Sequence, residues 1–165
     1  MFQTQERQFL QAYDQYADAI YRHCYFRTFQ EERAKDLVQD TFTKTWEYLA
    51  RGNQIENIRA FLYRTATNLI IDETRKPTDL SLDALTENNI EPGVVDDIDV
   101  QIDTDLLVVK LKELEDPYRE VIILKYIEGF KVKEIAEILD KSENVISVRL
   151  NRGIKKLKDL LPIHG

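Results

Sequence analysis

Apolar residues recur along the first half of the chain at the spacing of an α-helix. Between residues 34 and 49 they follow an i, i+3, i+4, i+7 pattern, which predicts a helix with one face in a core. The same spacing predicts a helix around residues 9–24 and a third over residues 58–75, which Pro77 stops. These three segments predict a bundle of helices in the N-terminal half.

The C-terminal part repeats the helical spacing in shorter segments. A helix is expected over residues 106–114, and Asp116-Pro117 predicts a second helix with Asp at the cap and proline at the first position. A short helix over residues 132–139, a break at Asp140-Lys141 and a long helix capped by Ser142 follow. With only five glycines and four prolines, the whole pattern predicts an all-α fold.

A segment between these halves, residues 78–105, interrupts the periodicity. It holds turn formers and nine acidic residues but no basic one, so we interpret it as an acidic linker. The predicted organisation is therefore two small helical domains, residues 1–77 and residues 106–165, joined by that linker. The net charge of −7 would by itself argue against nucleic-acid binding, but the linker carries the excess of negative charge and the two domains are neutral to basic.

Composition argues against several other classes of protein. No apolar run approaches the roughly 20 residues that span a bilayer, and the N-terminus lacks a signal pattern, so a cytoplasmic protein without a membrane span is expected. Cys24 is the single cysteine and lies beside His23, which cannot complete a zinc shell; we expect a packed Cys24 and no metal. No catalytic triad, phosphate-binding glycine loop or carboxylate pair is evident, so no cofactor and no enzymatic activity are expected.

The segment from residue 130 to residue 157 is typical of a helix-turn-helix motif, two helices joined by a short turn. Ile135, Ala136 and Leu139 should pack the first helix, and the exposed side of the second should present short polar groups and arginine to a major groove. Five basic residues between positions 149 and 158 would meet phosphates. A helical hairpin with a solvated basic face is the alternative. The outward residues are Ser147, Val148, Asn151 and Arg152, with Arg149 on the flank.

Two further surfaces are predicted in the N-terminal half. On the helix over residues 34–49, an outward acidic stripe could bind a basic partner helix by complementary charge, although a solvated face is the simpler reading. On the helix over residues 58–75, arginine, asparagine and exposed aromatics suit a strand-separated nucleic acid, although aromatics at this spacing more often belong to a core. The acidic stripe comprises Asp36, Gln39, Asp40, Thr43 and Glu47, and the second face comprises Arg64, Thr67, Asn68, Ile71 and Arg75, with Tyr63 and Phe61.

Together, these segments resemble a known family. DLVQDTF, then FLYRTATNL, then DPYREVIILKYIEGF and the helix-turn-helix occur in the order typical of the extracytoplasmic-function group of bacterial RNA polymerase sigma factors. The resemblance implies sigma region two, a variable linker and sigma region four. It implies core RNA polymerase and promoter DNA as partners, and an anti-sigma factor as a further one.

The resemblance also implies roles for individual residues. Core-polymerase binding falls on Asp36, Gln39, Asp40 and Thr43; minus-ten DNA binding on Phe61, Arg64, Asn68 and Arg75, with the loop over residues 51–58 capturing a flipped base; and minus-thirty-five DNA binding on Ser142, Ser147, Val148, Arg149, Asn151, Arg152 and Lys155. This sequence departs from the family at Phe61, where tryptophan is common, at Asp140, where glycine is frequent, and at Val148 and Ile154, where polar or basic residues are common.

One rival function uses the same helix-turn-helix: a stand-alone transcriptional regulator with the N-terminal half as a dimerisation or sensing domain. A helical adaptor that binds no nucleic acid has less support. Neither explains why DLVQDTF precedes a helix rich in arginine, asparagine and aromatics. The acidic linker is open to two accounts, folding back on the basic helix or lying in the positive channels of the polymerase. The second is favoured because exposed ion pairs are weak and screened by salt.

Overall fold

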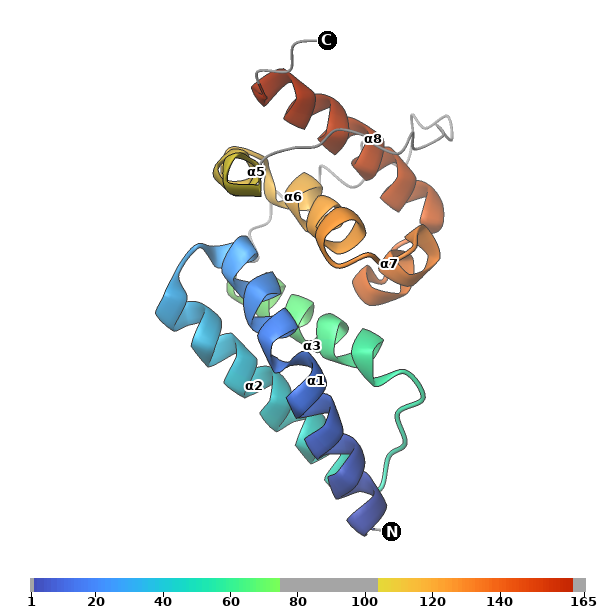
Figure 1. Ribbon diagram of the computed structural model, residues 1–165. Coiled ribbons are helices and arrows are strands. Elements are labelled where there is room, and N and C mark those ends of the chain that lie inside the picture. The colour runs from blue at the N-terminus through green and yellow to red at the C-terminus, as the bar shows by residue number, and fades with distance from the viewer. Residues whose placement is uncertain (1, 75–103, 162–165) are drawn as a thin grey trace. The chain divides into compact units, whose positions relative to one another are not determined.

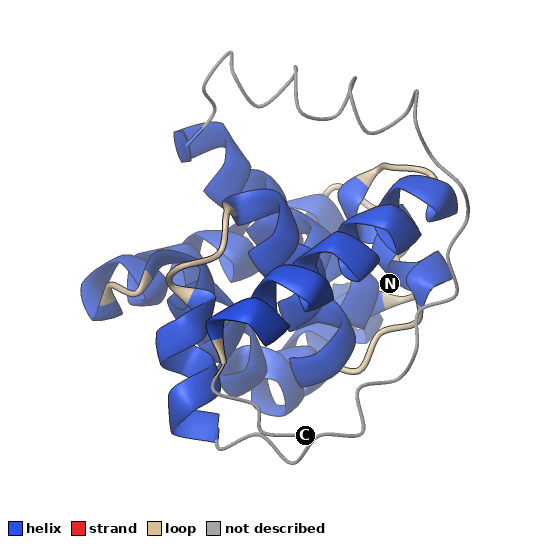
Figure 2. Ribbon diagram, turned by 90° about the horizontal axis from the view of Figure 1, so that it is seen from above, coloured by secondary structure: helices blue, strands red, loops and turns tan. Residues whose placement is uncertain are grey.

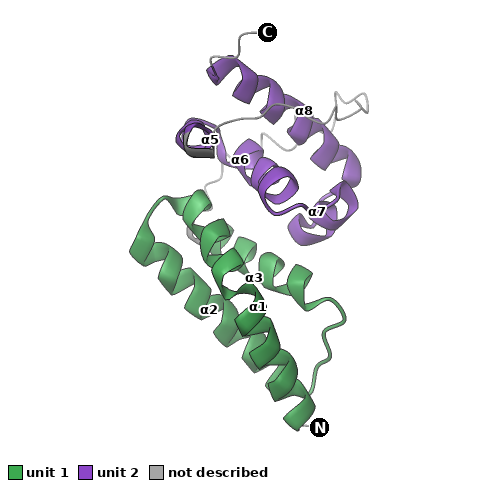
Figure 3. Cartoon of the chain, in the orientation of Figure 1, with its two compact units in different colours: residues 1–75 green, residues 76–165 purple. Residues whose placement is uncertain are grey.

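The computed structural model describes residues 2–74 and 104–161, and every regular element within these two ranges is a helix (Figure 2). The chain divides into two compact units, residues 1–75 and residues 76–165 (Figure 3). The all-α prediction is confirmed. Most of the predicted linker, up to residue 103, lies outside the described residues, and a helix begins at Thr104, two residues before the predicted start.

Unit 1 contains three helices, α1 (Phe2–Thr28), α2 (Glu31–Ala50) and α3 (Ile58–Thr74). Helices α1 and α2 run antiparallel and pack along their length, and α3 packs against both (Figure 1). The apolar residues that predicted α2 and α3 supply most of the core, because i, i+3, i+4 spacing places them on one face. The core includes Ile20, Cys24, Leu37, Leu49, Leu62, Tyr63, Ala66 and Ile70.

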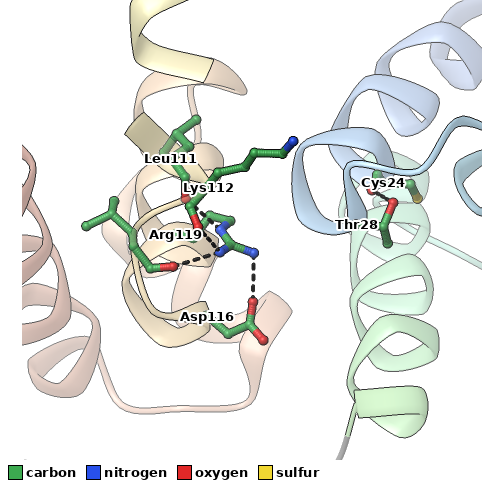
Figure 4. Close-up of polar contacts among 7 residues, drawn as sticks. Cys24, Thr28, Leu111, Lys112, Asp116 and Arg119 are labelled. Carbon is green, nitrogen blue, oxygen red and sulfur yellow. Dashed lines mark hydrogen bonds and ion pairs between the residues drawn. The ribbon is translucent and has the colours of Figure 1, made fainter. Parts of the chain in front are cut away.

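A tight corner sets the antiparallel arrangement of α1 and α2. Phe29 adopts a left-handed backbone conformation with a φ of 56°, and its N–H donates to the carbonyl of Tyr25 at 2.6 Å. The hydroxyl of Thr28 donates to the carbonyl of Cys24 at 2.9 Å (Figure 4). A left-handed residue at this position ends an α-helix and turns the chain, so α2 can begin at Glu31.

Unit 2 is built around its last helix. It contains α5 (Thr104–Leu111), α6 (Asp116–Ile122), a π-helical turn η1 (Ile123–Ile127) that continues α6, α7 (Val132–Leu139) and α8 (Glu143–Leu160). Helices α6 and α7 pack against α8. The buried apolar residues include Val121, Ile122, Leu124, Ile135, Ile138, Ile146, Leu150 and Leu157.

The start of α6 differs from the prediction. Glu115, not Asp116, occupies the cap position and makes no side-chain capping bond, while Asp116 is the first helical residue. Asp116 instead accepts a hydrogen bond from Arg119 at 3.1 Å (Figure 4). The remaining guanidinium N–H groups of Arg119 donate, at 2.7–3.0 Å, to the carbonyl oxygens of Leu111, Lys112 and Leu114. Arg119 therefore satisfies backbone groups at the end of α5 that no helical N–H can reach.

The turn between α7 and α8 agrees with the prediction. Asp140 adopts a left-handed conformation, with φ 55° and ψ 48°, and the N–H of Lys141 donates to the carbonyl of Ala136 at 3.0 Å. The hydroxyl of Ser142 accepts the N–H of Val145 at 3.1 Å, which confirms Ser142 as the cap of α8. The short helix, three-residue turn and long helix form the expected helix-turn-helix.

Candidate partner-binding and nucleic-acid surfaces

The acidic stripe on α2 lies on the surface, as predicted. Asp36, Gln39, Asp40, Thr43 and Glu47 are all exposed. On the opposite face, the buried hydroxyls of Thr41 and Thr45 donate to the carbonyl oxygens four residues before them, at 2.6 and 2.8 Å. These internal hydrogen bonds satisfy the hydroxyls of two polar residues that face the core.

Lys35, one of two exposed lysines next to the stripe, forms ion pairs with acidic residues one turn earlier in α2. Its ammonium group lies 3.4 Å from Glu31 and 3.5 Å from Glu32. The hydrogen bond to Glu31 and the charge of Glu32 raise the pKa of Lys35. The charge of Lys35 is therefore offset in part by Glu31 and Glu32 in the first turn of α2.

An apolar pocket of about 930 Å³ lies beside the acidic stripe and is lined by residues of α1 and α2. Its aromatic rings contact one another: Phe9 lies 5.3 Å from Trp46, and Tyr13 lies 5.0 Å from Phe42, centroid to centroid. Tyr13 is 48% exposed and Leu10 is 53% exposed, although apolar spacing alone would place Tyr13 in the core. Gln39 and Thr43, the two uncharged residues of the stripe, also line this pocket, so the stripe adjoins the apolar surface there.

The outward face of α3 carries the predicted polar residues. Arg64 and Asn68 are exposed, Ile71 is 36% exposed, and Phe61 is half-buried against Tyr48 with ring centroids 4.9 Å apart. Positions 61, 64 and 68 are spaced by three, four and seven residues, which places them on one face of the helix. An aromatic ring, a cation and an amide are therefore adjacent on this face.

Two predictions for α3 are wrong. Tyr63 is fully buried rather than exposed and packs edge-on against the imidazole of His23 at 5.2 Å. Thr67 is also fully buried. Because α3 packs against both α1 and α2, its buried face is wider than a single apolar stripe, and positions at the edges of the predicted outer face are covered. Arg75 lies outside the described residues.

The exposed side of α8 retains part of the predicted set. Arg152, Lys155 and Ser142 are exposed, and Ser147 and Asn151 are half-buried. Val148 and Arg149 were expected outside but are only 7% and 4% exposed, and burial lowers the pKa of Arg149. The prediction assumed that α8 is covered by other helices on one side only. The first two turns of α8 are instead covered on several sides, so Val148 and Arg149 are buried.

Among the five basic residues of this helix, Lys156 contacts residues at the start of α6. Lys156 forms an ion pair with Glu115 at 3.0 Å and lies over the ring of Tyr118 at 4.9 Å. These contacts tie the end of α8 to the start of α6. The set of cations on the solvent side of α8 that could meet phosphates is therefore Arg152, Lys155 and Lys158, which are all exposed.

His23 and Cys24 belong to the core of unit 1. Both are fully buried, and burial raises the pKa of the Cys24 thiol to about 12, as expected for a packed cysteine. Burial, assisted by the charges of Arg27 and Arg22, lowers the pKa of His23 to about 3. A neutral imidazole and a protonated thiol are accordingly the resting forms. In the described ranges, no three His, Cys, Asp or Glu side chains are grouped as metal ligands.

Models of two protein families match the chain. Residues 12–78 match Sigma-70 region 2, and residues 105–157 match Sigma-70 region 4. The chain is 32% identical over 160 residues to the ECF RNA polymerase sigma factor SigW of Bacillus subtilis, with 90% of this chain and 86% of the relative covered. It is 30% identical to the RNA polymerase sigma factor YlaC of Bacillus subtilis, covering 88% of this chain and 87% of the relative.

Solved structures show the same fold. The sigma factor RpoE of Bartonella quintana, in complex with the anti-sigma factor NepR, matches with a TM-score of 0.72 at 22% identity, over 96% of this chain and 99% of that one. CnrH, in complex with the cytosolic domain of CnrY, matches with a TM-score of 0.67 at 25% identity, over 94% of this chain and 88% of that one.

The match to region 2 covers the N-terminal half, the part of the chain that the rival reading as a stand-alone regulator leaves unexplained. That rival is therefore not favoured. Both domains of a sigma factor are present in the family's order, and the overall identity to curated members extends across nearly the whole chain. The chain belongs to the extracytoplasmic-function group of RNA polymerase sigma factors, which direct core polymerase to promoters and initiate transcription.

Proposed function

We propose that the acidic stripe of α2, comprising Asp36, Gln39, Asp40, Thr43 and Glu47, binds core RNA polymerase together with the adjoining apolar pocket. The observation that carries this assignment is that the exposed stripe adjoins the apolar pocket through Gln39 and Thr43 on one side of α1 and α2. Such a surface suits an amphipathic helix with basic flanks, because apolar burial supplies affinity while complementary charge sets orientation.

The two DNA-binding roles divide between the units. The face of α3 with Phe61, Arg64 and Asn68 binds the strand-separated minus-ten element, and Arg75 is retained in this set from the family pattern. The exposed side of α8 binds the minus-thirty-five element in the major groove. Arg152 and Lys155 are its best-placed cations, while the burial of Val148 and Arg149 makes them poorer candidates for direct contact.

The chain performs no catalysis under this proposal, because RNA synthesis belongs to the core enzyme, and it acts in the cytoplasm. No helix in the described parts of the chain is long and apolar enough to cross a membrane. The solved complexes of RpoE with NepR and of CnrH with CnrY lead us to propose an inhibitory protein partner for this chain as well.

Reconstitution with bacterial core polymerase tests the proposed function. Full-length protein and core polymerase are incubated with a library of randomised promoter sequences, and run-off transcripts are sequenced. We expect transcripts that start downstream of a two-part motif and that require both the protein and the core enzyme. Failure to bind core polymerase, or transcription that does not depend on the added protein, would contradict the proposal.

A further inference from the structure

The ammonium group of Lys156, near the end of α8, is held by two residues at the start of α6. It forms an ion pair with the carboxylate of Glu115 at 3.0 Å and lies 4.9 Å from the centre of the Tyr118 ring. The side chains of Lys156 and Glu115 are 47% and 53% exposed. Each contact alone is weak at such exposure, but both act on the same ammonium group, so together they favour the position of Lys156 against α6.

Two features of the fold bring these groups together. Glu115 occupies the cap position of α6 but makes no side-chain capping bond, which leaves its carboxylate available to Lys156. Tyr118 can lie close to α8 because Gly153 has no side chain: a Cβ at Gly153 would lie 3.2 Å from the Cβ of Tyr118. Lys156 follows Gly153 after three residues, about one helical turn, so its side chain can reach that ring.

The position of Lys156 in α8 is also one from which a lysine could reach DNA. It lies one turn after Arg152 on the same side of the helix, and next to Lys155; both neighbours are exposed and both are proposed to contact the minus-thirty-five element. A lysine side chain is long and flexible and acts as a point charge, so a released Lys156 could meet a phosphate in many registers on duplex DNA. Such contacts raise affinity without reading sequence.

Acidic residues surround Lys156 on the side of α8 next to α6. Glu113 and Asp159 line the same small pocket as Glu115 and Lys156, and both are exposed. Their negative charge disfavours the approach of a DNA backbone to this edge of the helix. The edge of α8 next to α6 is therefore the one turned away from phosphates when the cationic side is bound.

We propose that Glu115 is a specificity-determining residue for promoter binding because it withholds Lys156 from DNA; this rests on the proposed role of α8 in binding the minus-thirty-five element. On the promoter, base contacts fix α8 in one register, in which Lys156 at the edge next to α6 adds little. On other duplexes the protein has no preferred register, and a released Lys156 would add a phosphate contact in many of them. The ion pair thus lowers affinity for other DNA more than for the promoter.

A double-mutant cycle on Glu115 and Lys156 tests the proposal. Full-length variants are assembled with core polymerase, and the Kd is measured over a series of salt concentrations for a promoter recovered from the randomised library and for a duplex of scrambled sequence. On the scrambled duplex, Glu115→Gln should bind about 2- to 8-fold more tightly at about 0.1 M salt and should steepen the salt slope by about 0.9, the value for one added phosphate contact. On the promoter, the gain should stay below about twofold.

The other variants identify the source of this gain. Lys156→Gln alone should leave the salt slope unchanged, and the double variant Glu115→Gln/Lys156→Gln should lose the gain. Lys155→Gln is the matched control, because it removes the same charge from the neighbouring residue and should reduce the salt slope by about 0.9. All three positions are exposed, so these substitutions should not disturb the fold.

The outcomes separate this inference from the proposed function. If Lys155→Gln and Arg152→Ala both leave the salt slope unchanged, α8 does not bind DNA, and its proposed role is wrong together with the inference. If Lys156→Gln lowers the slope as much as Lys155→Gln does, Lys156 already contacts phosphates and only the inference is overturned. A gain that persists in the double variant would come from repulsion by Glu115 itself, and an equal gain on both duplexes would remove the role in specificity; either result overturns the inference.

Discussion

Gly153, whose side chain is a single hydrogen atom, lies where α8 and α6 approach each other closely. A Cβ at this position would lie 2.9 Å from Cδ1 of Ile122 and 3.2 Å from Cβ of Tyr118. Both neighbours are buried residues of α6. The absence of a side chain in the middle of α8 therefore permits the close approach of α6, at the cost in helix propensity that glycine carries.

We predict that Gly153→Ala destabilises the protein by about 1–2 kcal/mol, because overpacking by about 1–3 kcal/mol exceeds the gain of about 1 kcal/mol in helix propensity. Urea denaturation of the full chain measures the change. The double variant with Ile122→Val, which removes the closest atom, should recover part of the loss. A stabilised Gly153→Ala protein would show that α6 and α8 can separate freely.

The buried imidazole of His23 predicts a dependence of stability on pH. Its pKa is about 3 in the folded protein against 6.5 for an ordinary histidine, so the unfolded chain binds the additional proton between these values. The contribution of His23 is complete above pH 6.5 and is lost as the pH falls below it. By pH 5 the loss should reach about 2 kcal/mol.

Urea midpoints of the wild type and of His23→Phe at pH 7.5 and pH 5 test this prediction. Other groups titrate in both proteins, so the difference between them isolates His23. The wild type should lose more stability than the variant over this interval. Equal losses would mean that the imidazole is reached by water in the folded state.

At the scale of elements, the turn between α7 and α8 depends on one backbone conformation. Asp140 is left-handed, a conformation that glycine adopts freely, that aspartate tolerates and that β-branched residues avoid. We predict that Asp140→Val destabilises unit 2 by about 1–2 kcal/mol, whereas Asp140→Gly stays within about 1 kcal/mol of the wild type. Thermal unfolding of the full chain measures both. Equal stability of the valine and glycine variants would contradict the left-handed turn.

At the scale of the whole molecule, binding to core polymerase should depend on the acidic stripe. Asp40→Lys should weaken core binding by about 2–5 kcal/mol if the charge pairs are buried in the complex, while the free protein keeps its stability because Asp40 is exposed. Asp14→Lys is the matched control, since it makes the same charge change at an exposed position of α1. Unaltered core affinity of Asp40→Lys in a pull-down titration would refute this docking surface.

Promoter recognition should divide between the two units. Arg152→Ala should reduce closed-complex formation on promoters that need the upstream element and lower the salt dependence of binding, because a phosphate or base contact is lost. Asn68→Ala should leave the closed complex intact and reduce strand opening, measured as lost permanganate reactivity. Equal failure of both variants at closed-complex formation would contradict this division.

The periodicity of apolar residues was enough to predict most of the elements. Helices α2, α3 and α7 begin and end close to the predicted residues, and Ser142 caps α8 as expected, because these features depend on local spacing and on side-chain bonds within one turn. The exposed acidic stripe was equally predictable, since charged residues on one face of an amphipathic helix seldom face a core.

Only the tertiary structure decided which side chains at the edges of those faces reach the solvent. Tyr63, Thr67, Val148 and Arg149 are buried because their helices are covered on more than one side, and Tyr13 is exposed because α1 and α2 leave a pocket between their rings. Two further contacts also join separate helices. The ring of Tyr48 in α2 contacts the ring of Phe61 in α3, thirteen residues later. The guanidinium group of Arg119 in α6 donates a hydrogen bond to the carbonyl of Leu111 at the end of α5. A helical wheel describes one helix at a time, whereas exposure and ring contacts depend on how several helices pack together.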